Sequence, residues 1–561
     1  MLYLSTLLLS LFITLSLVPP LKALALRYHA VDMPDERKVH NRPIPKIGGL
    51  AMAFGALVPI LLWAAMNGFG HALLAGAAVI VLFGFIDDIW DLPYKAKFLA
   101  QIAAALVVIL FGDLQLSYLG GLAPEGFACP SPLSIPLTVL VIVGVTNAIN
   151  LSDGLDGLAG GITLMTFICI GFLAYNAENY FALTVSVAAI GAIFGFLRFN
   201  TYPAVIFMGD TGSQLLGFLA ICLSLHITQV NQPLSPLLPL ILLGFPILDT
   251  LTVMTERLMK GRSPFKPDKN HFHHKLMRLG LFHTEAVFAI YVLQSILILS
   301  AIAFRYYSDW FLLLFYALFS GIIIATFIVL DHLHWQLPRR DYIDTMIKGR
   351  LKFLKERHIL IKVSFRSVEF GLPALLAATC LLSENIPGYF AAVTGALALL
   401  FVLLVHLRPA LSSTAMRIGL YLVIPFLVYL SESGAAELAT TYSSLFSNSL
   451  FSNPGLHLYR LYHLAFGVII MFVVLTLKFT RRRKGFKTTP MDFLVLFIAL
   501  VVPSITSAHI ADLNMGMIAA KIIVLLFGYE VMIGELRGEV RRQSLFAAVA
   551  LGVVAVKYIL G

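Results

Sequence analysis

The sequence predicts an all-α polytopic membrane protein. Its 561 residues are 59% hydrophobic and only 12% charged, with a mean hydropathy of +0.89. Such a composition is typical of chains that cross a membrane many times. Apolar stretches of about 20 residues, the length of a membrane-spanning helix, recur along the whole chain. We therefore expect about 11 transmembrane helices in an N-terminal catalytic unit and about 7 more in a C-terminal extension.

The first apolar stretch, Leu2 to Leu26, is expected to remain in the protein as a helix. It lacks the basic n-region and the small-residue cleavage site of a secretory signal peptide. The four cysteines are scattered, mostly within apolar segments, and imply neither a disulfide framework nor a thiolate metal site. They are Cys129, Cys169, Cys222 and Cys380.

Lysine and arginine residues predict the orientation of the chain. They crowd into the polar loops around residues 27–46, 95–97 and 257–278, whereas the alternate loops contain almost none. By the positive-inside rule, the N-terminus lies outside and the basic loops lie in the cytoplasm. The net charge of +10 thus follows membrane topology and is no evidence for nucleic-acid binding.

The apolar spans before residue 335 are expected in the order of their approximate centres. These centres are Phe12, Leu57, Val79, Ala105, Val141, Ile168, Ala188, Ala220, Leu243, Leu293 and Ile322. We predict a catalytic membrane domain over residues 1–335, a basic cytoplasmic linker over 336–366, and a membrane extension over 367–561. The polar residues of the extension, such as Glu432 and His463, look isolated, and interfacial anchoring is their simplest explanation. An acidic external loop is expected around Ser431 to Glu437.

The segment TNAINLSDGLDGLAGG, residues 146–161, carries the most information about function. It follows an apolar span, and Asn147, Asn150, Asp153 and Asp156 recur at every third position. If the segment is helical, these side chains form one drifting stripe. The glycines between them would also allow a loop that closes around a ligand. Carboxamides and carboxylates beside small residues suit a polar ligand or a cation.

An adjacent acidic pair, Asp87 and Asp88, comes directly after another apolar span. Neighbouring carboxylates repel each other, so a cation or a proton is expected between them. Such a pair suits Mg²⁺, which takes one or two carboxylates together with phosphate oxygens. A solvated acidic helix end is the alternative.

A third cluster, FMGDTGS, places Asp210 between Gly209 and Gly212 on a turn before a helix. The small neighbours would let a phosphate or a metal ion approach, and Thr211 or Ser213 could cap the helix. Phe207 could present a ring face for stacking. The alternative is a helix N-cap without further function.

Two further cytoplasmic loops contain donors for phosphate oxygens. The loop over Asp35 to Met52 enters a helix at Gly48-Gly49 and carries Arg37, Lys38, His40 and Lys46, which the positive-inside rule alone could also explain. The second reads DKNHFHHKL and contains His271, His273 and His274. Their spacing fits neither a zinc finger nor a metalloprotease helix, so phosphate binding is favoured over a metal site.

These motifs together resemble the polyprenyl-phosphate N-acetylhexosamine-1-phosphate transferases, which include the phospho-MurNAc-pentapeptide translocase. The resemblance covers about residues 1–330 and rests on five motifs in the family's order. They are RKxHxxPxPxxGG, DD with a downstream KF..Q, NAxNxxDGxDGLAGG, FMGDTGS and HxHH. The resemblance implies transfer of a sugar 1-phosphate from a UDP-sugar to undecaprenyl phosphate, with release of UMP.

The resemblance also implies roles for single residues. Asp210 is expected to bind Mg²⁺, with Mn²⁺ as a substitute, and Asp88 lies in the same metal and lipid-phosphate region. Asp87 is expected to deprotonate or orient the attacking lipid phosphate, and Lys97 matches a lysine of the family's active site. The expected substrate-binding residues are Lys38, Asn147, Asn150, Asp153, Asp156, Phe207, His271, His273 and His274. Among these, Phe207 would stack on uracil and the histidines would contact donor phosphates or sugar.

The histidine loop resembles the branch of the family that uses simple UDP-N-acetylhexosamine donors. We therefore expect N-acetylglucosamine 1-phosphate as the transferred group and a cell-surface glycan such as O-antigen, teichoic acid or exopolysaccharide as the product. The alternatives are the phospho-MurNAc-pentapeptide transferase of peptidoglycan synthesis and, from a different class, a cation-coupled transporter. The expected location is the bacterial cytoplasmic membrane, with membrane lipids around a cytoplasmic active site. A homodimer, and later glycosyltransferases or a flippase docked on the extension, are further hypotheses.

Overall fold

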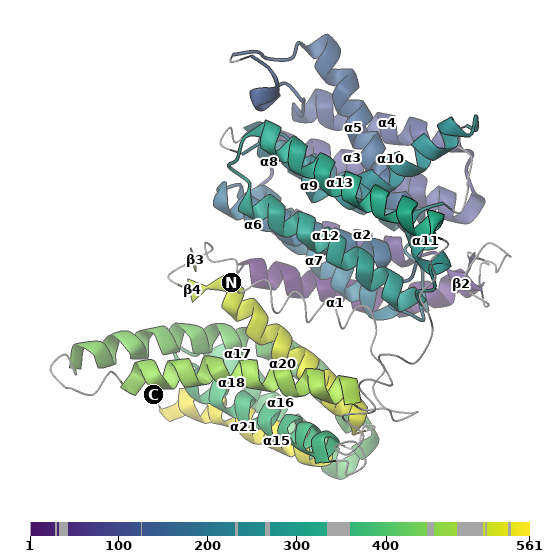
Figure 1. Ribbon diagram of the computed structural model, residues 1–561. Helices are drawn as coiled ribbons and strands as arrows, with labels where there is room; N and C mark the ends of the chain where they lie inside the picture. The colour runs from purple at the N-terminus through teal and green to yellow at the C-terminus, as the bar shows by residue number, and fades with distance from the viewer. Residues whose placement is uncertain are drawn as a thin grey trace. The chain divides into compact units, whose positions relative to one another are not determined.

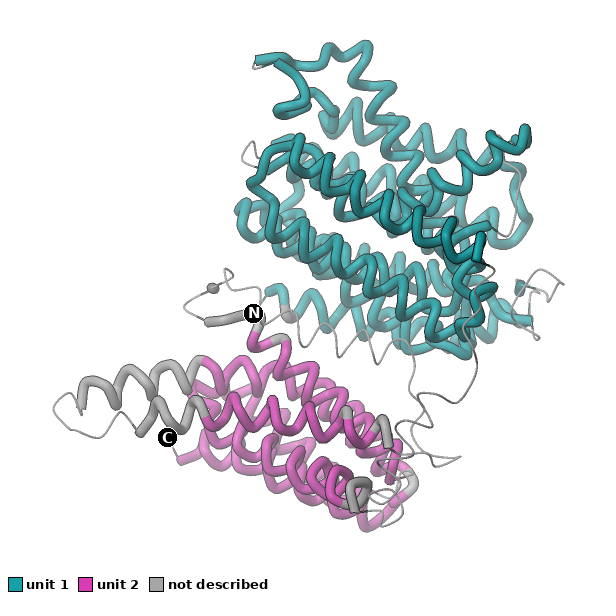
Figure 2. The backbone as a smooth tube through the Cα atoms, in the orientation of Figure 1, with its two compact units in different colours: residues 1–339, 489–491 teal, residues 340–488, 492–561 magenta. Residues whose placement is uncertain are grey.

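Long apolar helices make up most of the described chain. The computed structural model describes residues 2–27, 31–32, 43–124, 126–230, 234–263, 270–333, 359–445, 454–479, 509–510, 513–536 and 540–560. Among these residues, 13 helices are long and apolar enough to cross a membrane. The chain divides into two compact units, coloured separately in Figure 2; the described residues of the first lie within 2–333 and those of the second within 359–560. These observations confirm an all-α protein of the multi-pass membrane class.

Every expected centre in the first unit falls within a helix, except Leu243, where a span is broken in two. The helices are α1 (Leu2–Arg27), α2 (Gly48–Trp63), α3 (Gly68–Trp90), α4 (Tyr94–Gly112), α5 (Ser131–Leu151), α6 (Leu158–Asn176), α7 (Tyr180–Asn200), α8 (Gly209–Val230), α9 (Leu238–Leu242), α10 (Gly244–Met259), α11 (Phe272–Arg278), α12 (His283–Ala303) and α13 (Asp309–His332). A 3-10 turn, η1 (Gly120–Leu122), lies between α4 and α5. Strands β1 (Val31–Asp32) and β2 (Ile44–Pro45) pair in antiparallel fashion ahead of α2.

Helices α6, α7 and α8 form the interior of the first unit (Figure 1). Between 78% and 89% of the residues in their apolar windows are buried, against 17% for α1 and α13. Helix α6 packs on α7 and α12, while α8 packs on α2, α3 and α5. Since α8 is surrounded on several sides, its first turn lies among the ends of its neighbours.

Glycines bring the backbone of α8 unusually close to α2 and α3. A Cβ atom added to Gly49 would lie 2.6 Å from Gly212 Cα, and one added to Gly84 would lie 2.6 Å from Thr211 Cα. No larger residue fits at such a crossing without moving a helix. The close approach places the end of α3, which carries the acidic pair, directly beside the start of α8.

The ninth expected span is interrupted between α9 and α10, around Leu243. A break within an apolar span exposes backbone carbonyls that must find partners inside the protein. Gln294 Nε2 donates to Leu242 O at 2.7 Å, and Tyr316 OH donates to Gly244 O at 2.9 Å. The break therefore costs little free energy, because both carbonyls are paired within the protein.

The second unit is a separate bundle with its own aliphatic and aromatic core. Its described helices are α15 (Ile359–Leu382), α16 (Gly388–Leu407), α17 (Pro409–Leu445), α18 (Pro454–Phe479), α20 (Met515–Glu535) and α21 (Arg541–Leu560). Strands β3 (His509–Ile510) and β4 (Leu513–Asn514) form a short antiparallel pair. Most of the predicted basic linker and the segment 480–508 lie outside the described residues.

Two expectations for the second unit were wrong. The predicted external loop at residues 431–437 is part of the continuous helix α17. Glu432 is not an interfacial anchor but is 2% exposed and forms an ion pair with Lys521, which is 1% exposed. The Lys521 ammonium also lies 4.1 Å from the centre of the Tyr462 ring. Two residues that look isolated in the sequence thus neutralise each other inside the bundle.

Candidate active site

The first turn of α8 begins at a position that only glycine can occupy. Gly209 has φ +70°, which L side chains rarely adopt. A Cβ atom there would lie 2.5 Å from Asp88 Oδ1 and 2.6 Å from the backbone oxygen of Lys46. The sequence predicted a turn before the helix, whereas the structure starts the helix at Gly209, so Asp210 lies in its first turn.

Asp88, at the end of α3, caps the N-terminus of α8. Its Oδ1 accepts a hydrogen bond from Asp210 N at 2.7 Å, and its Oδ2 accepts from Thr211 N at 3.1 Å and Thr211 Oγ1 at 2.6 Å. The expectation that Thr211 or Ser213 caps this helix was wrong, because Ser213 Oγ donates back to Gly209 O instead. A carboxylate at a helix N-terminus satisfies orphan N–H groups and interacts favourably with the helix dipole.

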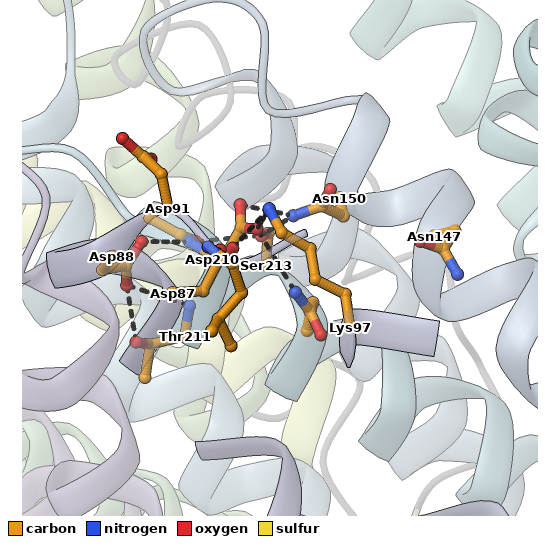
Figure 3. Close-up of polar contacts among 12 residues, drawn as sticks. Asp87, Asp88, Asp91, Lys97, Asn147, Asn150, Asp210, Thr211 and Ser213 are labelled. Atoms are coloured by element: carbon orange, nitrogen blue, oxygen red, sulfur yellow. Dashed lines mark hydrogen bonds and ion pairs between the residues drawn. The ribbon is translucent and has the colours of Figure 1, made fainter. Parts of the chain in front are cut away.

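Lys97, from the first turn of α4, bridges two carboxylates (Figure 3). Its ammonium lies 2.5 Å from Asp87 Oδ2 and 2.9 Å from Asp210 Oδ2. The other oxygen of Asp87 accepts from Leu92 N at 2.6 Å, which orients the buried carboxylate. The acidic pair, the lysine and the GDTGS turn therefore share one cluster, as expected for loops on the same side of the membrane.

Asn150, in the last turn of α5, completes this cluster. Its Nδ2 donates to Asp210 Oδ1 at 3.0 Å and to Ser213 Oγ at 2.8 Å. Asn147 lies apart from the carboxylates in Figure 3 and donates to Gln101 Oε1 at 2.5 Å. Of the two asparagines in the expected stripe, Asn150 contacts a carboxylate of the cluster. Asn147 is hydrogen-bonded to the amide of Gln101 instead.

Two glutamines link Asn147 to Asp210: Gln101, the last position of the KF..Q motif, and Gln214, which sequence reasoning missed. Gln101 donates to Gln214 Oε1 at 3.0 Å, and Gln214 donates to Asp210 Oδ2 at 3.4 Å. Both glutamines are buried, Gln101 on α4 and Gln214 on α8. The signal for them is a polar amide inside an apolar helix, where an unpaired amide would be costly.

The segment between α5 and α6 is a tight turn rather than a continued helix. Gly157 has φ +80° at the start of α6, and its N–H donates to Asn200 Oδ1 at 2.9 Å. Asp156 accepts a hydrogen bond from Ala204 N at 2.9 Å. The glycine-rich motif thus forms the loop that its composition allowed, and Asp156 ties it to the loop that precedes Phe207.

Asp153 lies in the same turn with a perturbed acidity. Burial, and then the negative charges of Asp210 and Asp156, raise the pKa of Asp153 to about 7. A carboxyl group with this pKa exchanges its proton near neutral pH. Asp153 therefore changes its charge near neutral pH, and a cation bound beside it would favour its ionised form.

The loop before α2 lies against the segment that contains Phe207. Phe207 N donates to Pro45 O at 2.8 Å, and Gly48 N donates to Phe207 O at 2.9 Å. Lys46 pairs with Asp32 at 3.1 Å, and although burial alone would lower the pKa of Lys46, Asp32 raises it. Lys38, the expected substrate-binding residue of this loop, lies outside the described residues, as do Arg37 and His40.

The histidine loop reaches the α5–α6 turn through His273. The ring of His273 packs so closely on Gly154 that an added Cβ would lie 2.6 Å from its Cε1 atom. Burial, and then the neighbouring His274 and His271, lower the pKa of His273 to about 2, so this ring is neutral at physiological pH. The three rings follow one another, with centroids 5.8 Å apart for His271 and His273 and 4.2 Å apart for His273 and His274.

Sequence reasoning also missed Asp249, a buried carboxylate of α10. Its Oδ2 lies 2.9 Å from His271 Nδ1, and its Oδ1 accepts from Phe272 N at 2.8 Å. An acid in the middle of an apolar span is costly unless it is paired, and this is the signal that could have found it.

The carboxylates near Lys97 fit a magnesium ion by their chemistry. Oδ2 of Asp87 and Oδ2 of Asp210 both face the Lys97 ammonium, so one cation already lies between them. Both oxygens of Asp88 are engaged by α8, which favours Asp87 over Asp88 as the carboxylate that joins Asp210. Mg²⁺ needs only one or two carboxylates besides phosphate oxygens. No group of three or more His, Cys, Asp or Glu side chains within the described part of the chain could hold a metal ion.

Comparisons with known proteins place this cluster in a family. The model of glycosyl transferase family 4 matches residues 71–228, which contain the acidic pair, Lys97, the α5–α6 turn and Asp210. A probable undecaprenyl-phosphate N-acetylglucosaminyl 1-phosphate transferase of Bacillus subtilis is 38% identical over 303 residues, covering 54% of this chain and 84% of that protein. The chain belongs to the polyprenyl-phosphate N-acetylhexosamine-1-phosphate transferases of this family.

Other members of the family are similar over the same share of the chain. A decaprenyl-phosphate N-acetylglucosaminephosphotransferase of Mycolicibacterium smegmatis is 36% identical over 312 residues, covering 50% of this chain and 76% of that protein. The undecaprenyl-phosphate alpha-N-acetylglucosaminyl 1-phosphate transferase of Escherichia coli K12 is 33% identical over 297 residues, covering 51% of this chain and 81% of that protein. The similarity thus accounts for about half of the chain.

Proposed function

We propose that the chain transfers N-acetylglucosamine 1-phosphate from UDP-N-acetylglucosamine to undecaprenyl phosphate and releases UMP. The observation that carries this proposal is the Asp87–Lys97–Asp210 cluster, which lies within the family match. The cluster combines carboxylates with a lysine that can donate hydrogen bonds to phosphate oxygens. The names of the relatives support the same sugar and the same class of lipid.

The proposed reaction is a displacement at the phosphorus atom that bears the sugar. An oxygen of undecaprenyl phosphate forms a bond to this phosphorus, and the bond to the oxygen that bridges to the uridine-bearing phosphate breaks. UMP leaves with the bridging oxygen, and the product is a lipid pyrophosphoryl sugar. Phosphoryl transfer of this kind depends on positioning and on neutralising charge rather than on covalent chemistry from the protein.

Each residue of the cluster has a proposed task in this displacement. Asp87 orients the attacking lipid phosphate and takes up its proton when one is present. Lys97 moves between carboxylate and phosphate oxygens, which is possible because it already contacts two side chains. Asp88 positions Asp210 by fixing the start of α8. Mg²⁺, held by Asp210 with Asp87, would neutralise the charge of the diphosphate; Asp88 keeps a positioning role.

The nucleoside side of the proposed site lies along the α5–α6 turn. Asn150, Asp153 and Asp156 offer hydrogen-bond groups, and Phe207 offers a ring for the uracil base. The histidine loop, which contacts this turn at Gly154, would supply donors to the diphosphate. Asn147 and Lys38 stay predictions, since Asn147 faces Gln101 and Lys38 is not among the described residues.

The proposed location is the bacterial cytoplasmic membrane with the active site on the cytoplasmic side. This orientation rests on the basic loops around residues 27–46, 95–97 and 257–278, which share one side in the helix order. UDP-sugars are made in the cytoplasm, so the proposed site faces its donor. The second unit, which lies outside the similarity to relatives, is proposed to serve assembly with later glycosyltransferases or a flippase.

A donor panel tests the proposed function. Membranes that contain the protein receive Mg²⁺, undecaprenyl phosphate and one of several donors, including UDP-N-acetylglucosamine, UDP-N-acetylgalactosamine and the UDP-MurNAc-peptide. The expected result is UMP and a lipid pyrophosphoryl sugar from UDP-N-acetylglucosamine, with loss of turnover by orders of magnitude in Asp87→Asn and Asp210→Asn. A strong preference for the UDP-MurNAc-peptide would favour the peptidoglycan alternative and overturn the donor assignment.

A further inference from the structure

We propose that Asp249 is a positioning residue that orients His271 toward the diphosphate of the sugar donor. This inference rests on the proposed function and adds to it a residue outside the sequence motifs. Asp249 lies on α10, whereas His271 lies immediately before α11. The carboxylate is 3% exposed and the histidine 7%, so both groups are withdrawn from bulk water.

One carboxylate holds two consecutive residues of the histidine loop. Oδ2 faces His271 Nδ1 at 2.9 Å, and Oδ1 accepts from the backbone N–H of Phe272 at 2.8 Å. The first contact orients the ring and the second orients the backbone that carries it. Together they remove most of the freedom that a histidine at a loop end would otherwise have.

The aromatic ring of Phe272 anchors the histidine loop by apolar packing, so anchoring does not require Asp249. Phe272 is 2% exposed and packs against Phe245 of α10 and Phe327 of α13, with ring centroids 5.7 and 4.9 Å apart. Burial of a large aromatic side chain is worth about 1.5–3 kcal/mol. Apolar docking can therefore hold the loop in place without a carboxylate, and the buried Asp249 needs another explanation.

The role of Asp249 follows from which nitrogen of the His271 ring carries a proton. An ionised carboxylate only accepts hydrogen bonds, so its neighbour Nδ1 carries a proton. With Nδ1 occupied, Nε2 is the ring nitrogen left for a substrate. The His271 ring stacks on His273, and His273 contacts the turn that carries Asp153 and Asp156. Asp249 thus sets the angle at which Nε2 of His271 meets a ligand bound along that turn.

The test is a steady-state comparison of purified wild-type protein with Asp249→Asn, His271→Gln and the double variant Asp249→Asn/His271→Gln. Asparagine keeps an acceptor for the Phe272 N–H and loses the carboxylate that faces His271. We expect kcat/KM for UDP-N-acetylglucosamine to fall about 10- to 100-fold in Asp249→Asn, because a misplacement of about 1 Å costs about 10²-fold. The KM for undecaprenyl phosphate should stay unchanged, and adding His271→Gln should cause little further loss.

Glu256→Gln is the matched control on the same helix. Glu256 forms an ion pair with Lys275 of α11, so this variant removes another charged link between α10 and the loop without touching His271. We expect it to keep wild-type kinetics, and we expect the thermal midpoints of all variants to lie close together. Equal losses in Glu256→Gln and Asp249→Asn would reduce Asp249 to a docking contact and overturn the proposal.

The outcomes separate this inference from the proposed function. Wild-type protein that makes no lipid pyrophosphoryl sugar from UDP-N-acetylglucosamine rejects the proposed function, and the inference with it. An active wild type with unchanged kinetics in Asp249→Asn rejects the inference alone. Independent, multiplying losses from Asp249→Asn and His271→Gln would also reject it, because residues that act as one unit are not additive.

Discussion

Replacing Asp88 by asparagine should destabilise the first unit and misplace Asp210. The carboxylate accepts three hydrogen bonds from the first turn of α8, at 2.7, 3.1 and 2.6 Å. Asparagine retains one acceptor oxygen, which can serve Asp210 N. Its amide nitrogen then faces Thr211, whose hydroxyl can turn to accept but whose N–H cannot.

The expected loss follows from these contacts. Thr211 is 1% exposed, so an unpaired N–H there costs about 1–3 kcal/mol. Loss of a negative charge at a helix N-terminus adds about 0.3–1 kcal/mol. Together they lower the free energy of unfolding by about 1.3–4 kcal/mol. Because Asp210 N is bound by Asp88, turnover should also fall, by about 10²-fold for a shift near 1 Å.

Denaturant titration of the purified protein in detergent measures the stability change, and UMP release measures turnover. Thr211→Val is the matched variant, because it removes the hydroxyl contact alone and should cost about 1 kcal/mol. The double variant should lose less than the sum of the two single losses, since both changes disrupt one set of hydrogen bonds. Wild-type stability and turnover in Asp88→Asn would refute the capping role.

Three further predictions concern the rest of the chain. Lys521→Met should lower the free energy of unfolding by about 3–5 kcal/mol in denaturant titration, and adding Glu432→Leu should recover most of it; a harmless single variant would contradict the buried pair. Because burial and neighbouring acids raise the pKa of Asp153 from 3.8 to about 7, the stability that its protonated form contributes is complete below pH 3.8 and lost as pH rises through 7. Asp153→Asn should therefore be more stable than wild type at pH 8 and not at pH 4; the opposite order in thermal unfolding would refute this sign. Truncation after Arg339 should leave transferase activity in a folded first unit, and complete loss of turnover in a fragment that still binds UDP-sugar would assign the second unit to the catalytic machinery.

The sequence predicted the cluster of charged residues because its acids lie at the ends of apolar spans that face the same side of the membrane. Asp87, Asp88 and Asp210 had to lie on one side of the membrane, and the glycines around Asp210 indicated that another group could approach it closely. What the sequence could not give is which oxygen meets which donor. Asp88 was expected near a metal ion, and the structure adds that it caps α8, a role that depends on the crossing of α3 and α8 at Gly84.

Residues inside apolar spans escaped prediction for a common physical reason. Gln214 and Asp249 belong to none of the motifs, and each has a partner outside its own helix, Gln101 for Gln214 and His271 for Asp249. The same holds for Glu432 and Lys521, which are 89 positions apart in the chain. Hydropathy shows that such groups need partners, whereas helix packing decides which partners they obtain.

The fate of the donor phosphates tests the central claim most directly. Purified protein receives undecaprenyl phosphate, Mg²⁺ and UDP-N-acetylglucosamine labelled with ³²P on the phosphate that bears the sugar. Transfer of sugar 1-phosphate predicts that the label enters the lipid fraction in step with unlabelled UMP, and that Asp210→Asn abolishes both. Label released as UDP, with an unlabelled glycolipid, would mean that the bond between the sugar and its phosphate is cleaved, and would contradict the account.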